Sequence, residues 1–134
     1  MIKREKSIKD LQLHDKNIKR IESTGDKNFI IDIEDNGYII ELKFINVKHV
    51  KIDNFRLGNI ILDIVVYESK YLNKFEKELR LLLDVNRDAK DSYLEEIKEK
   101  IKKGELLFVS VQSSYGAYGN ILCERIETSY IKES

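Results

Sequence analysis

A β-hairpin signal at residues 29–44, FIIDIEDNGYIIELKF, constrains the fold more than any other stretch of the chain. Asn36-Gly37 separates two runs of alternating apolar and polar residues, and this dipeptide favours the positive φ angles of a two-residue type I′ turn. Counting outward from the turn places the large apolar residues opposite one another, in the pairs Ile33–Ile40, Ile31–Leu42 and Phe29–Phe44. The face that carries these pairs is predicted to be core, and the other face to meet water.

Other runs of alternating or β-branched residues predict further strands around the hairpin. They lie at residues 17–23, 46–53, 60–68, 105–112 and 120–131. Together with the hairpin they predict a twisted antiparallel sheet of about six or seven strands. One or two helices are expected to cover one face of this sheet, in a single α+β domain of all 134 residues.

Two segments are candidates for these helices. Ser92 and Glu95 form a capping box, and Gly104 supplies a stop, so a helix is predicted over residues 93–103. Residues 69–85 fit the apolar period of both a helix and a strand. The Leu, Glu, Lys and Arg content of this second segment favours helix, although both interpretations stay open.

The composition argues against several classes of partner. Lys plus Arg and Asp plus Glu number 24 each, so no net positive field favours nucleic acid or anionic lipid. The apolar runs are too short to span a membrane, and the basic start MIKREKSIKDLQL lacks the apolar stretch of a secretory signal. Cys123 is the single cysteine and forms no intrachain disulfide. The expected localisation is cytoplasmic, with no nucleic-acid or membrane partner.

The first candidate site is QSSYGAYGN, residues 112–120. Gly116 and Gly119 allow the backbone angles of a tight connection, so a hairpin loop accounts for the stretch without a ligand. A turn needs no tyrosines, however, and Tyr115 and Tyr118 are rigid amphipathic side chains of the kind that recognition surfaces use. Two interpretations stay open: a binding loop, and a turn whose tyrosines cover an edge of the core.

The second candidate site is His14-Asp15. A histidine beside a carboxylate suits a general base with its orienting group, but adjacent residues of an extended chain point to opposite sides unless a turn intervenes. On the predicted hairpin, Asp32 lies opposite Glu41, and two close carboxylates share a proton or a cation, or are simply solvated. The plainer interpretations are a polar pair that ties down the first strand and a solvated pair on an exposed face.

No metal site, cofactor or catalytic residue is predicted. His14, His49 and Cys123 are the soft and imidazole ligands of the chain, and they are scattered along it. Cys123 lies within a run typical of a strand, where a buried cysteine behaves as a small hydrophobic residue.

The residues LHDKNIKRIE near the start, with SYGA before the final strand, resemble a loose group of small bacterial proteins. The pattern of the group is an early Leu-His-Asp, an Ile a few residues later and then a β-hairpin, and this chain matches it at His14, Asp15, Tyr115 and Gly116. Some proteins of this kind occur beside polymorphic or contact-dependent toxins and resemble immunity proteins, which bind and block a cognate toxin. The resemblance implies a protein-binding function and transfers no catalytic residue.

The leading hypothesis is therefore a protein-binding module of a bacterial cytoplasm, an immunity protein whose partner is a toxin domain. The alternatives are a small hydrolase-like enzyme that uses His14, Asp15 and the Asp32/Glu41 pair, and a non-catalytic domain that forms homo-oligomers. A cleft that gathers His14 with Asp32 or Glu41 would favour the enzyme. An exposed display of the two loop tyrosines would favour binding.

Overall fold

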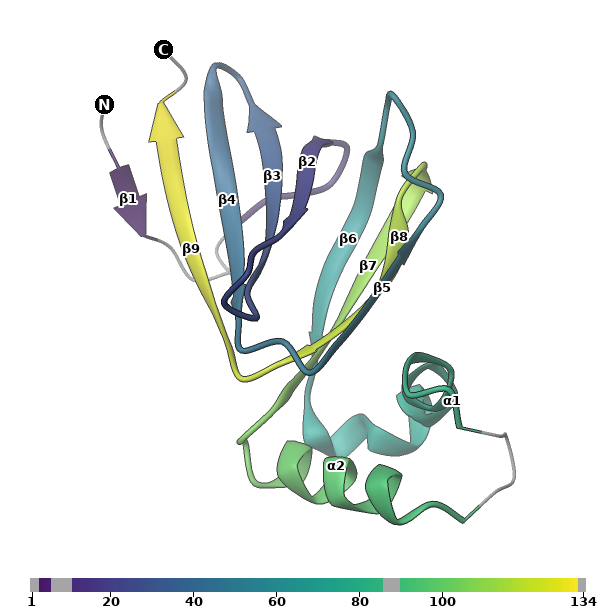
Figure 1. The fold of residues 1–134 in the computed structure, drawn as a ribbon. Helices are drawn as coiled ribbons and strands as arrows, with labels where there is room; N and C mark the ends of the chain where they lie inside the picture. Colours follow the sequence, from purple (N-terminus) through teal and green to yellow (C-terminus); the bar gives the residue numbers. More distant parts are fainter. Residues whose placement is uncertain (1–2, 6–10, 86–89, 133–134) are drawn as a thin grey trace.

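The described residues form one nine-stranded antiparallel sheet, with two α-helices packed at one end of it (Figure 1). The computed structural model describes residues 3–5, 11–85 and 90–132. In order along the sheet, the strands are β1 (Lys3–Glu5), β9 (Arg125–Lys132), β4 (Tyr38–Ile45), β3 (Phe29–Asp35), β2 (Asn17–Ser23), β6 (Ile60–Tyr67), β7 (Leu107–Tyr115), β8 (Tyr118–Cys123) and β5 (His49–Asp53). The helical elements are the 3-10 turn η2 (Ser69–Tyr71), α1 (Leu72–Leu82) and α2 (Ser92–Lys102). Across these described ranges, no helix has the length and apolarity that crossing a membrane requires.

The α+β class and the antiparallel sheet are confirmed, whereas the predicted strand count is wrong. Eight strands have five or more residues, and β1 adds a three-residue strand. The run at 120–131, predicted as one strand, is split at Glu124 into β8 and β9. At the split the pairing passes from β4–β9 to β5–β8, and three residues separate Ile45 from His49 while two separate their partners Arg125 and Leu122. An extra residue on one strand bends the pair, and here the bend ends one strand and starts the next.

The predicted hairpin is confirmed in its register. Strands β3 and β4 pair Ile33 with Ile40, Ile31 with Leu42 and Phe29 with Phe44. At the turn, Asn36 has a φ of 49° and Gly37 a φ of 83°, as a type I′ turn requires. All the side chains of the predicted apolar face are buried.

The sheet folds over on itself, so that two leaves face one another (Figure 1). One leaf holds β1, β9, β4, β3 and β2, and the other holds β6, β7, β8 and β5. The leaves are joined where Asn17 of β2 pairs with Ile60 of β6, and the chain crosses between them at residues 46–48 and at Glu124. The main hydrophobic core lies between the leaves. Its buried side chains include Ile31, Ile33, Ile40, Leu42 and Phe44 from the first leaf and Ile61, Val109, Val111 and Ile121 from the second.

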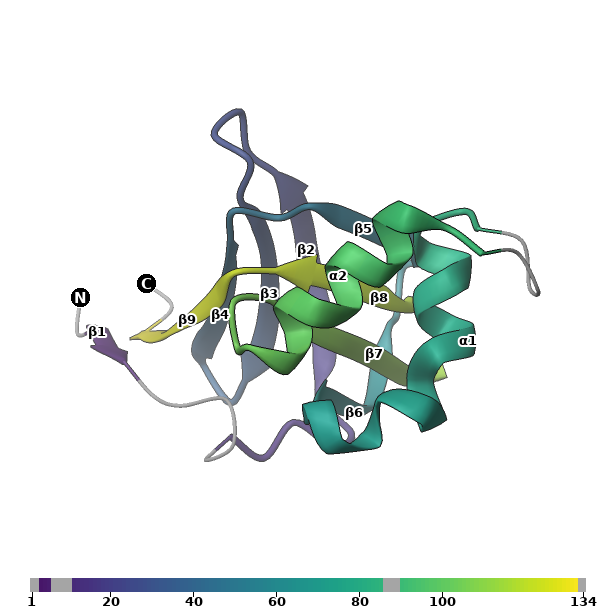
Figure 2. The same ribbon diagram turned by 90° about the horizontal axis from the view of Figure 1, so that it is seen from below.

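The two helices cover the outer face of the second leaf (Figure 2). Phe108 of β7 and Leu122 of β8 point outward into a cluster with the apolar faces of the helices, while Val109 and Ile121 point inward to the main core. Strands buried on both faces are nearly continuous apolar runs, as β7 and β8 are. The interpretation of residues 69–85 as helical is confirmed for Leu72–Leu82.

The predicted second helix is present, but Ser92 does not cap it. Asp91 is the N-cap, and its Oδ1 accepts a hydrogen bond from the Leu94 N–H at 2.9 Å, while Ser92 is the first helical residue. Aspartate and serine cap helices about equally well, so the extended backbone of Asp91 decides the position. Gly104 ends the helix with a φ of 77°, as predicted.

Candidate functional site

Residues 112–120 form the end of β7, a turn at Gly116-Ala117 and the start of β8. Tyr115 and Tyr118 flank the turn and are 54% and 49% exposed, so about half of each side chain faces solvent. Gly116 is buried with a φ of 89°, and a Cβ atom there would lie 2.4 Å from the Oδ1 atom of Asn59. The turn therefore requires glycine at position 116 and presents both tyrosines to the outside.

Asn59 anchors this turn to the loop between β5 and β6. The residue is 1% exposed. Its Oδ1 accepts hydrogen bonds from the N–H groups of Arg56 and Ala117, both at 2.9 Å, and its Nδ2 donates to the Arg56 carbonyl at 2.7 Å. Its own N–H donates to Asn17 Oδ1 at 2.8 Å. This set of contacts, the Asn59 network, ties the start of β2, the β5–β6 loop and the β7–β8 turn together.

The segments that the Asn59 network joins expose large apolar side chains. In the described residues ten large hydrophobic side chains are exposed, and six of them lie on the β5–β6 loop, the first half of β6 and the β7–β8 turn. They are Phe55, Leu57, Ile60, Leu62, Tyr115 and Tyr118. We call these six side chains the apolar end surface. Two of its segments are adjacent, since Ile60 pairs with Tyr115 across β6 and β7.

Only the two tyrosines of this surface were predicted from the sequence. Phe55 and Leu57 lie in NFRLGN, whose turn-like composition predicts a break between two strands and carries no motif of a site. Two large apolar residues inside a short polar loop were the available signal, because a loop runs over the surface and cannot bury them easily. The exposure of Leu57, which is complete, follows from that position.

His14 and Asp15 lie beside the apolar end surface, on the segment that adjoins β6. A turn intervenes between them, with a φ of 66° at Asp15, so the side chains do meet, with His14 Nε2 3.4 Å from Asp15 Oδ1. His14 Nδ1 lies 3.0 Å from the Leu62 carbonyl oxygen, and the Asp15 N–H donates to the Ile61 carbonyl at 2.8 Å. The candidate residues from the two ends of the chain therefore both lie next to β6, with Tyr115 on one side of the strand and His14-Asp15 on the other.

The His14 ring is poorly arranged for acid–base catalysis. Each of its nitrogens faces an oxygen that can only accept, the Leu62 carbonyl on one side and the Asp15 carboxylate on the other. Both oxygens belong to the protein itself, so the ring makes its contacts within the chain. The side chains of His14 and Asp15 are 64% and 73% exposed, so water surrounds the pair. The arrangement suits a contact that holds the entering segment against β6.

The predicted carboxylate pair forms but is separate from His14. Asp32 lies directly opposite Glu41 on β3 and β4. Arg20 Nε donates to Asp32 Oδ2 at 2.7 Å, and this hydrogen bond raises the pKa of Arg20. In the described part of the chain, His14 makes no hydrogen bond or ion pair with Asp32 or Glu41. Arg20 thus holds Asp32, whose side chain is only 14% exposed, in an ion pair that lies apart from His14 among the described residues.

The other residues considered as metal ligands lie in different surroundings. His49 Nε2 on β5 is 2.8 Å from the Tyr93 hydroxyl of α2, and burial lowers the pKa of His49. Cys123 is buried in the main core, where desolvation raises the pKa of its thiol to about 12. Within residues 3–5, 11–85 and 90–132, no three His, Cys, Asp or Glu side chains gather as metal ligands.

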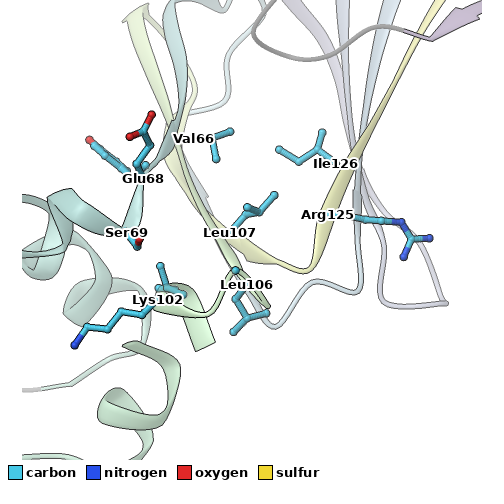
Figure 3. Close-up of a pocket in the computed structure, with 11 residues that line it drawn as sticks. Val66, Glu68, Ser69, Lys102, Leu106, Leu107, Arg125 and Ile126 are labelled. Carbon is cyan, nitrogen blue, oxygen red and sulfur yellow. The ribbon is translucent and has the colours of Figure 1, made fainter. Parts of the chain in front are cut away.

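A cavity of about 690 Å³ opens between the leaves beside α2 (Figure 3). Val66, Leu107 and Ile126 line it with apolar groups from three strands. Lys102 and Arg125 also line it, but their charged ends point away from these apolar side chains (Figure 3). The volume is that of a small-molecule site, and Tyr67, Glu68 and Ser69 add polar groups to its lining.

No protein-family model, curated protein or solved structure matches the chain. A function must therefore be inferred from the surfaces and contacts described above. Among them, the apolar end surface combines exposure with a fixed backbone.

Proposed function

We propose that the protein is a binding module for another protein and that the apolar end surface is its contact site. The observation that carries this proposal is the gathering of six exposed large apolar side chains on segments held by the Asn59 network. Soluble proteins rarely leave such side chains together in water, and a patch of this kind commonly marks an interaction site. Tyrosine and arginine are also the residue types that contribute most to protein interfaces, and Arg56, Tyr115 and Tyr118 lie here.

The backbone of this surface is fixed before any partner arrives. Asn59 bonds the β5–β6 loop from inside, and on the outside the Arg56 guanidinium lies 5.7 Å from the centre of the Tyr115 ring. Arg56 Nε also donates to Asn54 Oδ1 at 2.9 Å. Polar groups of the loop are thus paired within the protein. The Leu57 side chain is exposed and is available to enter a pocket on a partner. A surface that is already ordered loses less entropy on binding, which favours affinity.

Within this class we infer an immunity protein that acts in a bacterial cytoplasm and neutralises a toxin domain. The resemblance carried by His14, Asp15, Tyr115 and Gly116 supports this inference, because those residues lie around the same part of β6. The equal numbers of acidic and basic residues do not favour nucleic acid or a membrane as the partner. An inhibitor needs affinity and no reaction chemistry.

The test is a binding titration with the protein encoded beside this chain in its genome. Leu57→Ser removes the most exposed apolar side chain of the surface, and Leu81→Ser, on α1 and 64% exposed, is the matched control. We expect Leu57→Ser to weaken binding at least about tenfold, equivalent to about 1.4 kcal/mol, and Leu81→Ser to leave it unchanged. Equal affinities for wild type and Leu57→Ser would remove the apolar end surface as the contact site. An absence of binding would contradict the immunity function.

The double change Tyr115→Ala with Tyr118→Ala is a second test of the same surface. Both side chains are about half exposed, so their truncation should change the melting temperature little. The affinity for the same partner should fall at least about tenfold, since interface tyrosines commonly contribute 2 kcal/mol or more. A large loss of thermal stability with unchanged affinity would mean that the tyrosines serve the fold alone.

A further inference from the structure

Strand β5 forms one edge of the sheet. Among the described strands it stands last in the sheet order and pairs with β8 alone, and Figure 2 shows it outside β8. In the described part of the chain, no hydrogen bond reaches its other edge from another backbone segment. A free strand edge is a template for pairing with another strand. Val50, on this edge strand, is 38% exposed.

The sequence of β5 is complementary to itself when two copies of the strand pair antiparallel. In an antiparallel pair centred on Lys51, Val50 lies opposite Ile52 of a second copy, and His49 lies opposite Asp53. Positions two apart across such a pair are within reach of long side chains, so each Lys51 also approaches Asp53 of the other copy. The pairing therefore sets apolar residues against apolar residues on one face. On the other face it interleaves two lysines with two aspartates.

We propose that β5 is a self-association edge, at which two copies of the chain pair antiparallel about Lys51. The pairing has a twofold axis at Lys51, and both copies use the same edge, so the assembly closes at a dimer. The backbone groups of Val50 and Ile52 and their neighbours gain partners, and the second leaf continues from one copy into the other. This proposal is independent of the apolar end surface and of any function assigned to it.

Lys51 limits the strength of this dimer. Like charges directly opposite one another destabilise a strand pair, and a lysine on an edge strand is a common guard against uncontrolled pairing. The two diagonal Lys51–Asp53 contacts offset this repulsion. We therefore expect a reversible dimer, with a dissociation constant between about 1 µM and about 1 mM, in place of an obligate one.

The charge pattern allows a test by complementary variants of the full chain. Lys51→Glu places a new carboxylate near Asp53 of the other copy, and Asp53→Lys places a new ammonium group near Lys51 of the other copy. Because each variant alone sets like charges together, each should dimerise at least about tenfold more weakly than wild type. In a heterodimer of the two variants, opposite charges face each other at position 51. Each of the two diagonal contacts between positions 51 and 53 also joins opposite charges. We expect the mixture to form a heterodimer tighter than the wild-type homodimer, measured by sedimentation with one variant labelled at its N-terminus.

Two controls separate this edge from other surfaces. Lys132→Glu changes a lysine on β9, away from β5, and Leu57→Ser alters the apolar end surface. Both should dimerise as wild type does. The proposal is overturned if the wild type stays monomeric up to about 1 mM and the mixed variants form no heterodimer. It is equally overturned if a dimer forms that ignores the changes at positions 51 and 53 or is abolished by Leu57→Ser.

Discussion

Replacing Asn59 by alanine tests whether one buried amide holds the apolar end surface in place. The side chain of Asn59 makes three hydrogen bonds, from the N–H groups of Arg56 and Ala117 and to the Arg56 carbonyl. Asn59→Ala removes all three. It also leaves the N–H of Ala117, a residue only 1% exposed, without its acceptor.

The expected loss of stability follows from counting these bonds. A typical intramolecular hydrogen bond contributes about 1 kcal/mol net, so the three bonds of the Asn59 side chain give about 3 kcal/mol. This sum is a minimum, because the Ala117 N–H also loses its acceptor and a buried donor without a partner costs about 1–3 kcal/mol. A loss of this size is a large part of the 5–15 kcal/mol that stabilises an ordinary domain, which makes it easy to detect.

Urea unfolding measures this loss, with Asn17→Ala as the matched control. Asn17 Oδ1 accepts one hydrogen bond in the same network, from the Asn59 N–H, so its removal should cost about 1 kcal/mol. For an m-value of about 2 kcal/mol/M, the midpoint of Asn59→Ala should fall by about 1.5 M and that of Asn17→Ala by about 0.5 M. Equal midpoints for the two variants, or a loss below about 1 kcal/mol for Asn59→Ala, would refute the reasoning.

Three further outcomes follow from the cap, the charges and the core. Asp91→Ala should lower stability by about 1 kcal/mol, while Ser92→Ala changes it by less, as the two urea midpoints will show. Lys98 holds the pKa of Glu76 below its ordinary value, so the stability that Glu76 contributes is present above the unfolded pKa and is lost as pH falls through the folded one. Glu76→Gln should therefore be less stable than wild type at pH 7, and the difference should shrink as the pH falls below the ordinary pKa of a glutamate. Cys123, whose pKa burial raises to about 12, should react with a thiol reagent at pH 8 only after unfolding; fast reaction of the folded protein would contradict its burial.

The parts of the fold that depend on neighbours in the sequence could be predicted. The hairpin register follows from Asn36-Gly37 and the alternation around it, because the turn fixes which residues face one another. The helix after Asp91 also follows from local pattern. Its cap does not, because two good capping residues stand side by side and only the backbone geometry distinguishes Asp91 from Ser92.

The parts that depend on distant pairing could not be predicted. The break at Glu124 falls between two pairings, β4 with β9 and β5 with β8, whose strands are far apart in the sequence. In the same way His14 and Tyr115 lie on opposite sides of β6, because their two segments flank this strand, an order that no local signal reveals. Asn59 was missed for another reason: asparagine is an ordinary loop residue, and its burial is visible only when the turn at Gly116 lies against it.

Asn59 and Leu57 show why the β5–β6 loop is more than a connection. Burying an amide is costly unless its groups are bonded, and Asn59 is buried with three side-chain bonds, so the loop is held in one conformation. The same conformation leaves Leu57 completely exposed, where it adds nothing to stability. Leu57→Ser should therefore change the free energy of unfolding by less than about 0.5 kcal/mol, in contrast to Asn59→Ala. A side chain that is dispensable for folding, presented on a backbone that is fixed, is the arrangement expected of a binding contact.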